Sequence, residues 1–374
     1  MNPHIVQILP ALNEGGVERG TVEISRELVK RGYRSTVISS GGKLVDTLTR
    51  DGAEHISLDV KSKNLLTVPV RVSRLADTLN RIKPDLVHYR SRVPGWLFMF
   101  ANRCLQIPFV STVHGLNSVN RYSRIMTQGM RVICPSNAVV EYIRKHYDTP
   151  EEKIRLIHRG IDPEQFDPAK LDRAFISDFR QRYAPDTHFV VLGVGRITPV
   201  KGYDTLIHAT ALLRYNIPNI RTLIVGSAEA SRTAHLEALK QTIAQLGLQD
   251  TVLFTGGQRN MAEIYSCGNV LVSSNTAKPE AFGRSMAEAL AMNCPVIATA
   301  SGGALDIVRD GMDGWLIPPN DDEILAHQLL KASRTTFRNL REDALARFSL
   351  QQMVDKTEAV YREILRPPSL RLTT

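Results

Sequence analysis

The sequence predicts an α/β protein built from two doubly wound parallel sheets, and three observations support this fold class. The chain has 374 residues, about twice the length of a typical domain. Short apolar runs alternate with amphipathic segments from residue 5 to residue 134, and the alternation starts again at residue 189. Runs such as Val190–Val194 are apolar throughout, as parallel strands covered on both faces are.

The first half opens with a βαβ unit. Gly15-Gly16 separates its first strand from its helix, and Gly32 ends that helix because glycine readily adopts the left-handed conformation found there. The expected elements are strand 5–9, helix 17–31, strand 35–39, helix 68–82, strand 85–89, helix 95–104, strands 109–113 and 132–134, and a short helix capped by Ser136.

The second half repeats the alternation after a connection rich in Gly and Pro at residues 155–168. We therefore expect domains at 1–165 and 166–349, and an amphipathic helix in 350–374 that could pack back on the first domain. The expected elements are strand 189–193, helix 203–214, strand 222–225, helix 234–246, strand 252–254, helix 261–267, strand 270–272, helix 284–292 and strand 295–298.

Composition excludes several classes of protein. No apolar run approaches the roughly 20 residues of a membrane-spanning helix, and the first residues lack a signal-peptide pattern, so we expect a cytoplasmic protein. The four cysteines form no CxxC or Cys/His cluster, which argues against zinc and disulfides and suggests buried thiols.

The net charge of +9 is concentrated in the first half. Residues 1–165 hold 24 Lys and Arg against 16 Asp and Glu, whereas residues 166–374 hold 23 against 22. Between residues 60 and 135, twelve cationic side chains face only Asp77 and Asp85. Such a surface favours an anionic partner, namely nucleic acid, a phosphorylated acceptor or anionic lipid, although a merely solvated basic face has the same composition.

Two segments of the second half have the residue types of an anion and sugar site. The first strand runs into Gly195, with Arg196 and Lys201 five residues apart, so that two cations can converge on one diphosphate at a strand end. This segment contains neither a P-loop nor a GxGxxG fingerprint, which disfavours an ATPase or a dehydrogenase. Further on, Glu280 and Glu288 flank the start of a helix, where carboxylates can accept hydrogen bonds from sugar or ribose hydroxyls.

These segments resemble the donor site of retaining GT-B glycosyltransferases of family 4, and the similarity extends in order along almost the whole chain. The residue pattern is most similar to that of bacterial lipopolysaccharide-core enzymes, notably over residues 16–23 and 88–96. Further matching segments are Gly15-Gly16-Val17-Glu18-Arg19, His114-Gly115, Gly160-Ile161-Asp162, Ser301-Gly302-Gly303 and Gly314–Pro319. The sequence departs from the family pattern at Asp306, where Glu is common, and at Arg159, where Asn is common.

The resemblance implies a GT-B fold, with two Rossmann-like domains facing across a cleft, and a role for each motif residue. Arg196 and Lys201 would neutralise the leaving diphosphate in place of a metal, Glu280 would bind the transferred sugar, and His114 would contact it near C6. The residues implied to bind the rest of the donor are Gly15, Gly16, Phe282, Gly283, Arg284, Ser285 and Glu288, of which Glu288 would bind the ribose.

By this resemblance the chain would be a retaining, metal-independent transferase without a cofactor. It would move a sugar from a nucleoside-diphosphate donor, with UDP expected, to an anionic glycolipid or lipopolysaccharide-core acceptor at the inner membrane face. Arg90 and Arg92 would form the anionic-acceptor surface. A GT-B epimerase or phosphorylase remains an alternative, as does a nucleic-acid-binding protein, which the scarcity of aromatic residues among the arginines disfavours.

Overall fold

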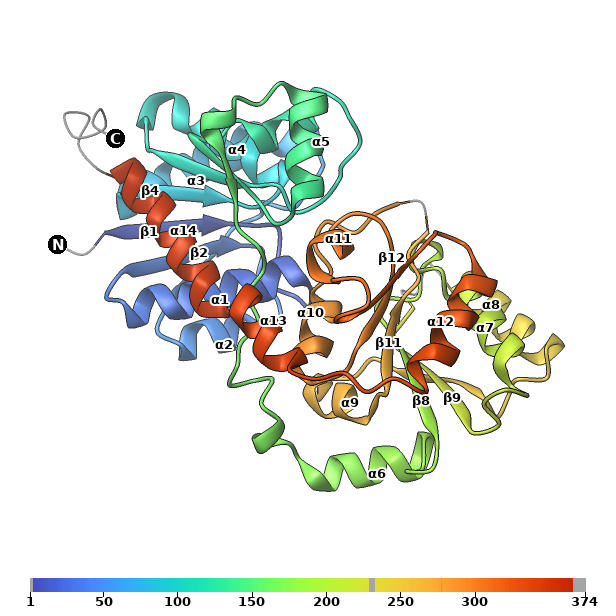
Figure 1. Ribbon diagram of the computed structural model, residues 1–374. Helices are drawn as coiled ribbons and strands as arrows, with labels where there is room; N and C mark the ends of the chain where they lie inside the picture. Colours follow the sequence, from blue (N-terminus) through green and yellow to red (C-terminus); the bar gives the residue numbers. More distant parts are fainter. Residues whose placement is uncertain (1–2, 229–232, 277, 366–374) are drawn as a thin grey trace. The chain divides into compact units, whose positions relative to one another are not determined.

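The computed structural model describes residues 3–228, 233–276 and 278–365 (Figure 1). The chain divides into two compact units: the first comprises the chain up to Gly160 and again from Leu350, and the second is Ile161–Ser349. The sequence placed the first of these divisions at residue 165. At the observed division a Cβ added to Gly160 would lie 2.5 Å from Leu350 Cα, so only glycine fits there without displacement.

The first unit contains a seven-stranded parallel sheet of strand order β3-β2-β1-β4-β5-β6-β7. Its strands are β1 (His4–Ile8), β2 (Arg34–Ser39), β3 (Glu54–Ser57), β4 (Leu86–Tyr89), β5 (Phe109–Thr112), β6 (Arg131–Cys134) and β7 (Ile154–Leu156). The strand order reverses between β1 and β4. Doubly wound sheets bind ligands at the carboxyl ends of the strands beside such a reversal.

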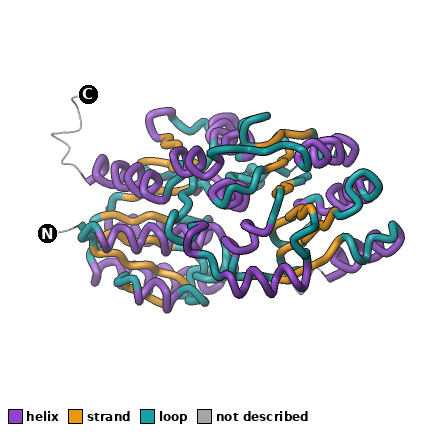
Figure 2. The backbone as a smooth tube through the Cα atoms, turned by 60° about the horizontal axis from the view of Figure 1, so that its bottom comes forward, coloured by secondary structure: helices purple, strands orange, loops and turns teal. Residues whose placement is uncertain are grey.

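Helices cover both faces of this sheet, as Figure 2 shows. They are α1 (Gly16–Lys30), α2 (Val45–Arg50), α3 (Val68–Ile82), α4 (Arg92–Leu105), α5 (Asn137–Tyr147) and α14 (Leu350–Leu365), with 3-10 turns η1 (Leu65–Thr67), η2 (Ser123–Thr127) and η3 (Glu151–Lys153). Helix α4 starts at Arg92, three residues earlier than expected, with Ser91 at its N-cap. Cys104, on the last turn of α4, is exposed, whereas the other three cysteines are buried as expected.

The last described helix, α14, packs on the first unit, alongside α1 (Figure 1). Its apolar side chains share a core with strands β1, β4, β5 and β6. Glu358 accepts hydrogen bonds from Arg31 at 2.5 Å and from the Tyr33 hydroxyl at 2.7 Å. Residues 366–374, the remainder of the segment in which we expected this helix, lie outside the described residues.

The second unit contains a six-stranded parallel sheet of order β10-β9-β8-β11-β12-β13. The strands are β8 (Phe189–Val194), β9 (Ile220–Val225), β10 (Val252–Gly256), β11 (Val270–Ser273), β12 (Val296–Thr299) and β13 (Gly314–Ile317). The helices are α6 (Arg173–Tyr183), α7 (Tyr203–Leu213), α8 (Thr233–Gln245), α9 (Met261–Cys267), α10 (Arg284–Ala291), α11 (Ala304–Ile307), α12 (Asp322–Ala332) and α13 (Leu340–Phe348), with turns η4 (Pro168–Lys170) and η5 (Pro199–Lys201).

Both faces of the second sheet are buried, which explains the continuous apolar strands. Val190 and Leu192 pack in the core beneath α9, α10 and α13, whereas Val191 between them packs in the core beneath α7, α8 and α12. Successive side chains of a strand point to opposite faces, so a strand covered on both sides must be apolar at every position. The predicted pair of doubly wound α/β units is confirmed.

Candidate active site

The anion and sugar motifs of the second unit lie on loops that leave adjacent strands. Arg196 and Lys201 follow β8, and Glu280 follows β11. Strands β8 and β11 are the neighbours between which the strand order reverses. The carboxyl ends of parallel strands meet at one edge of the sheet, so the topology brings these motifs together at a ligand-binding position.

Lys201 and Glu280 meet directly. Lys201 Nζ lies 3.2 Å from both carboxylate oxygens of Glu280, and Asn275 Nδ2 donates to Glu280 at the same distance. The two charged side chains keep 21% and 32% of their surface exposed, so both can be reached from solvent. Asn275 Oδ1 is buried and has no hydrogen-bond partner, which leaves one further acceptor beside this pair.

Glycines shape the loop that carries Arg196. Gly195 has φ 146° and Gly202 has φ 61°, conformations that favour glycine. A Cβ added at Gly202 would lie 1.9 Å from Ser274 O, so the loops after β8 and β11 approach within backbone contact. Arg196 is exposed on this loop, whereas Lys201 is half-buried at the end of η5.

Glu288 lies on the second turn of α10 and is only 5% exposed. Its carboxylate accepts hydrogen bonds from the Tyr265 hydroxyl at 3.1 Å and from Arg284 Nε at 3.2 Å. A carboxylate offers about four acceptor positions, so two donors leave capacity for a pair of ligand hydroxyls. The sequence motif did not identify Tyr265, which comes from α9, and it gave no sign that the Arg284 side chain binds Glu288.

The start of α10 lies between the two carboxylates. Gly283 caps the helix with φ 102° and no side chain caps it by a hydrogen bond. Phe282 is buried and its ring packs against Phe348 at 5.7 Å between centroids, so only its backbone can face a ligand. Ser285 follows on the first turn of the helix and is half-buried.

The glycines that follow β12 hold the Glu280 loop in place. A Cβ added at Gly302 would lie 2.3 Å from Glu280 O, and one added at Gly303 would lie 2.2 Å from Phe282 O. Gly303 N also donates to Glu280 O at 2.9 Å. The Ser301-Gly302-Gly303 motif therefore packs against the backbone that carries Glu280, which gives a physical reason for its place in the motif series.

In the first unit, His114 follows β5, and its Nδ1 is hydrogen-bonded to Arg159 Nη2. Burial, with the charges of Arg159, Arg90 and His88 nearby, holds the pKa of His114 well below its usual range. Because a guanidinium can only donate, Nδ1 must be the acceptor, and the ring proton of the neutral imidazole lies on Nε2. Nε2 is buried and has no hydrogen-bond partner, so its proton is an unsatisfied donor.

The expected acceptor surface needs a correction. Arg90 is 2% exposed and does not lie on the surface, since it follows β4 into the interior, where its Nε donates to Gln7 at 2.8 Å. Arg92 is half-buried at the start of α4, and its Nη1 donates to Ser123 Oγ at 3.2 Å. The basic surface therefore cannot include Arg90.

Gly15 and Gly16 begin α1, after β1. Gly15 is the N-cap, and a Cβ added there would lie 2.3 Å from the Glu18 carboxylate. Gly16 is the first helical residue and is exposed. The two glycines therefore lie where the loop that leaves β1 enters α1, and β1 is a strand beside the reversal of strand order in the first unit.

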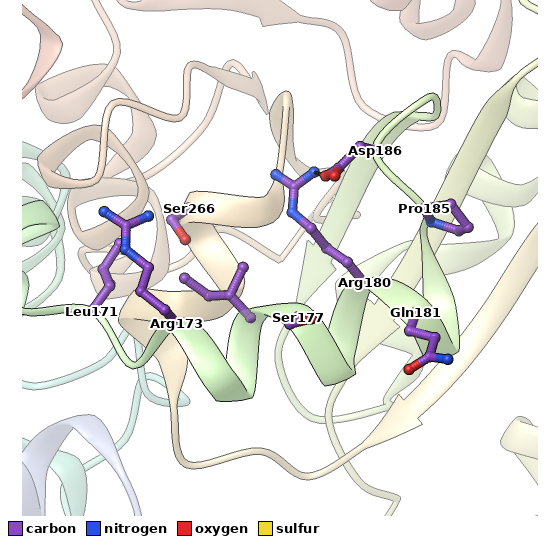
Figure 3. Close-up of a pocket in the computed structure, with 9 residues that line it drawn as sticks. Leu171, Arg173, Ser177, Arg180, Gln181, Pro185, Asp186 and Ser266 are labelled. Carbon is purple, nitrogen blue, oxygen red and sulfur yellow. Dashed lines mark hydrogen bonds and ion pairs between the residues drawn. The ribbon is translucent and has the colours of Figure 1, made fainter.

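A separate hollow of about 610 Å³ lies against α6 and contains none of the residues predicted from sequence (Figure 3). Arg173, Ser177 and Arg180 line it from α6, and Ser266 lines it from α9; Arg180 pairs with Asp186. Because this hollow holds no grouping of catalytic side chains, the motif residues remain the stronger candidate site.

Among the residues that the structure describes, no group of three His, Cys, Asp or Glu side chains could hold a metal ion. Over the same described ranges, no helix combines the length and apolar character needed to cross a bilayer.

Comparison with known proteins identifies relatives of both halves. Residues 14–165 match the model of "Glycosyltransferase Family 4", and residues 175–345 match that of "Glycosyl transferases group 1". A crystal structure of a glycosyltransferase from Rickettsia africae is 30% identical with a TM-score of 0.89, over 98% of this chain and 99% of that one.

Two further relatives have names that state different substrates or ligands. The D-inositol 3-phosphate glycosyltransferase of Streptomyces scabiei is 29% identical over 353 residues, which are 88% of this chain and 77% of that protein. HepE of Anabaena, solved in complex with UDP and glucose, is 22% identical with a TM-score of 0.83, over 96% of this chain and 99% of that one. At that identity the likeness to HepE concerns the fold.

Proposed function

Because the chain belongs to glycosyltransferase family 4 and has the GT-B fold, we propose that it moves a sugar from a nucleoside-diphosphate donor to an anionic lipid-linked acceptor. UDP is the expected nucleotide, and the acceptor is a glycolipid or lipopolysaccharide core at the inner membrane face. The reaction retains the anomeric configuration and needs neither a metal nor a cofactor.

The observation that supports this proposal most is the meeting of Lys201 and Glu280 where the strand order reverses. A cation for a phosphate and a carboxylate for sugar hydroxyls lie 3.2 Å apart at the position where such sheets bind ligands. Arg196, on the same loop as Lys201, adds a second cation. Two cations of fixed charge can stabilise the departing diphosphate, where negative charge develops in the transition state.

The ion pair between Lys201 and Glu280 can open at little cost. Both side chains are partly exposed, and such pairs contribute about 0–1 kcal/mol. A donor phosphate can therefore take Lys201, which releases Glu280 to accept hydrogen bonds from the sugar. Before a donor binds, the ion pair keeps both charges compensated.

Glu288 is suited to the ribose. It is buried and held by Tyr265 and Arg284, so its orientation is fixed before the ligand binds. Its remaining acceptor positions match two adjacent hydroxyls. When Glu288 binds the ribose, the diphosphate of the donor is bound by Arg196 and Lys201.

His114 contributes a hydrogen-bond donor and not a base. Its pKa is lowered and Arg159 occupies Nδ1, so the neutral ring can offer only the Nε2 proton to a hydroxyl or carbonyl oxygen of the donor sugar. No described carboxylate is assigned as a nucleophile. We propose front-face attack by the acceptor hydroxyl, with the cation-bound diphosphate leaving from that same face and taking up the hydroxyl proton.

Nucleotide binding tests this function. UDP is the first probe, since HepE was solved with UDP, and GDP and ADP follow it. In EDTA, one of these nucleotides should raise the Tm of the protein, by an amount that grows with its concentration. Arg196→Ala and Lys201→Ala should abolish the rise.

Lys240→Ala is the matched control, because Lys240 is an exposed lysine of the same unit, on α8. It should respond to the nucleotide as the natural chain does. A Tm that no nucleotide changes, or that responds equally in the Lys201→Ala variant, would rule out the proposed donor site.

A further inference from the structure

A pocket of about 900 Å³ opens in the first unit at the carboxyl edge of its sheet. Pro10, which follows β1, and Ser91, which follows β4, are among the residues that line it. Strands β1 and β4 are the neighbours between which the strand order reverses. The volume lies within the roughly 300–1,000 Å³ of small-molecule sites, and the position is where doubly wound sheets bind ligands.

The walls of the pocket are apolar and aromatic, and they come from two helices that pack together, α3 and α4. The main apolar lining residues are Val68, Pro69, Val93, Trp96, Leu97 and Phe100. The Trp96 and Phe100 rings lie 5.7 Å apart, and Leu65, which also lines the pocket, is 81% exposed. Contiguous exposed apolar surface of this kind marks a binding site for an apolar ligand.

Hydrogen bonds hold these walls in place. Arg71 is buried and donates to Ser62 O and Asn64 O at 2.8 Å, which fixes the segment that leads to Leu65. On the other side, Trp96 Nε1 donates to Tyr122 O at 2.9 Å. The pocket is therefore formed before any ligand binds, which lowers the entropic cost of binding.

The rim of the pocket is cationic. Lys61 and Lys63, both exposed, line the pocket together with Arg92, whose guanidinium lies 5.4 Å from the centre of the Tyr122 ring. Among the described residues that line the pocket, none is Asp or Glu. A ligand that matches both wall and rim has an apolar chain and a negatively charged head group.

We infer that this pocket binds the lipid phosphate of a membrane-anchored acceptor, with one hydrocarbon chain against α3 and α4 and the phosphate at Lys61, Lys63 and Arg92. This inference rests on the proposed function, because it names the chemistry of the acceptor. The cations of this pocket then form the surface for an anionic acceptor, which buried Arg90 cannot form.

Three probe compounds separate the contributions of the hydrocarbon chain and of the charge to binding in this pocket. They are decyl phosphate, decanol and inorganic phosphate. Trp96 lines the pocket and reports binding by its fluorescence, while Trp315 is buried in the other unit. We expect decyl phosphate, below its micelle concentration, to shift the emission to shorter wavelength and saturate. Its affinity should exceed that of decanol by about tenfold, and inorganic phosphate at equal concentration should cause no shift.

Two variants test the two parts of the pocket. Lys61→Glu with Lys63→Glu should weaken decyl phosphate about tenfold, with a smaller effect at high salt, and should leave decanol unchanged. Phe100→Ser should weaken both amphiphiles. The matched control, Lys145→Glu with Lys356→Glu, changes net charge equally on exposed residues of α5 and α14 and should bind as the natural chain does.

The rise in Tm with nucleotide reports the donor site separately. If nucleotide stabilises every variant but decanol binds as tightly as decyl phosphate, or the Lys61 and Lys63 variant binds unchanged, the lipid-phosphate inference is overturned and the donor proposal stands. If inorganic phosphate alone competes fully with decyl phosphate, the inference is also overturned. If no nucleotide stabilises the protein, the donor proposal fails, and a selective response to decyl phosphate still supports the pocket.

Discussion

Removing the charge of Arg159 tests whether this residue sets the position of the proton on His114. In Arg159→Met the donor to Nδ1 is lost, while the side chain keeps a similar length. Hydrogen bonds that involve a charged group contribute about 1.5–3 kcal/mol, and 1.4 kcal/mol corresponds to about a tenfold change in an equilibrium constant. We therefore expect the oriented Nε2–H form to be at least about tenfold less favoured, and kcat/KM to fall by about that factor.

The pKa of His114 should move in a defined direction. Arg159 is one of the charges that lower it, so Arg159→Met raises the pKa, and burial with Arg90 and His88 keeps it below the ordinary value. Protonation places a second donor on Nδ1. The acid limb of kcat/KM should therefore shift to higher pH in Arg159→Met, and Arg159→Lys should restore most of the natural profile.

Nitrogen-15 NMR of the histidine rings measures the tautomer directly. In the natural chain at pH 7.5, His114 should show a protonated Nε2 and an unprotonated Nδ1. Arg155→Met is the control, because Arg155 pairs with Glu363 elsewhere in the same unit, and it should leave the His114 signals unchanged. A His114 ring protonated on Nδ1 in the natural chain would refute the reasoning.

Three further predictions concern the site and the core. Tyr265→Phe removes one donor to the buried Glu288 carboxylate and should raise KM for the donor about tenfold with little change in kcat; initial rates that show an unchanged KM would contradict this role. Gly303→Ala places a Cβ against backbone and should lower the free energy of unfolding by about 1–3 kcal/mol in urea titrations, whereas unaltered stability would mean that the loop relaxes freely. Acidification should destabilise the fold: the pKa values of buried His88 and His114 are lowered, so the unfolded chain binds protons that the folded chain does not. Each histidine then contributes up to about 1.4 kcal/mol per pH unit below about pH 6.5, and a urea midpoint that stays constant from pH 7.5 to pH 5.5 would exclude this linkage.

The central strands of both sheets were predictable from sequence, and several peripheral elements were not. Strands such as β8 are covered on both faces, so their apolar runs identify them. Strands β3 (Glu54–Ser57) and β7 (Ile154–Leu156) were not predicted, because they lie at the sheet edges, where fewer apolar side chains are needed. Helix α6 was also missed, since Phe179 is its only buried residue among those described.

Contacts between residues distant in sequence limited the prediction of the site. The resemblance to family 4 implied that Lys201 and Glu280 belong to one site, and the reversal of strand order explains why they meet. It could not give the Tyr265 hydrogen bond to Glu288 or the Arg159 bond to His114, which depend on packing between separate elements. Arg90 was assigned to the acceptor surface because residues 60–135 are strongly basic, yet its place directly after the buried strand β4 was a signal of its burial.

The configuration of the released sugar tests the central claim most directly. UDP-, GDP- and ADP-sugars are incubated with the protein in EDTA, and proton NMR follows the first sugar anomer that appears from the donor that reacts. The account predicts that the anomer matches the donor linkage, that EDTA has no effect, and that Lys201→Ala is inactive. Release of the opposite anomer, a requirement for metal, or activity undiminished in Lys201→Ala would contradict it.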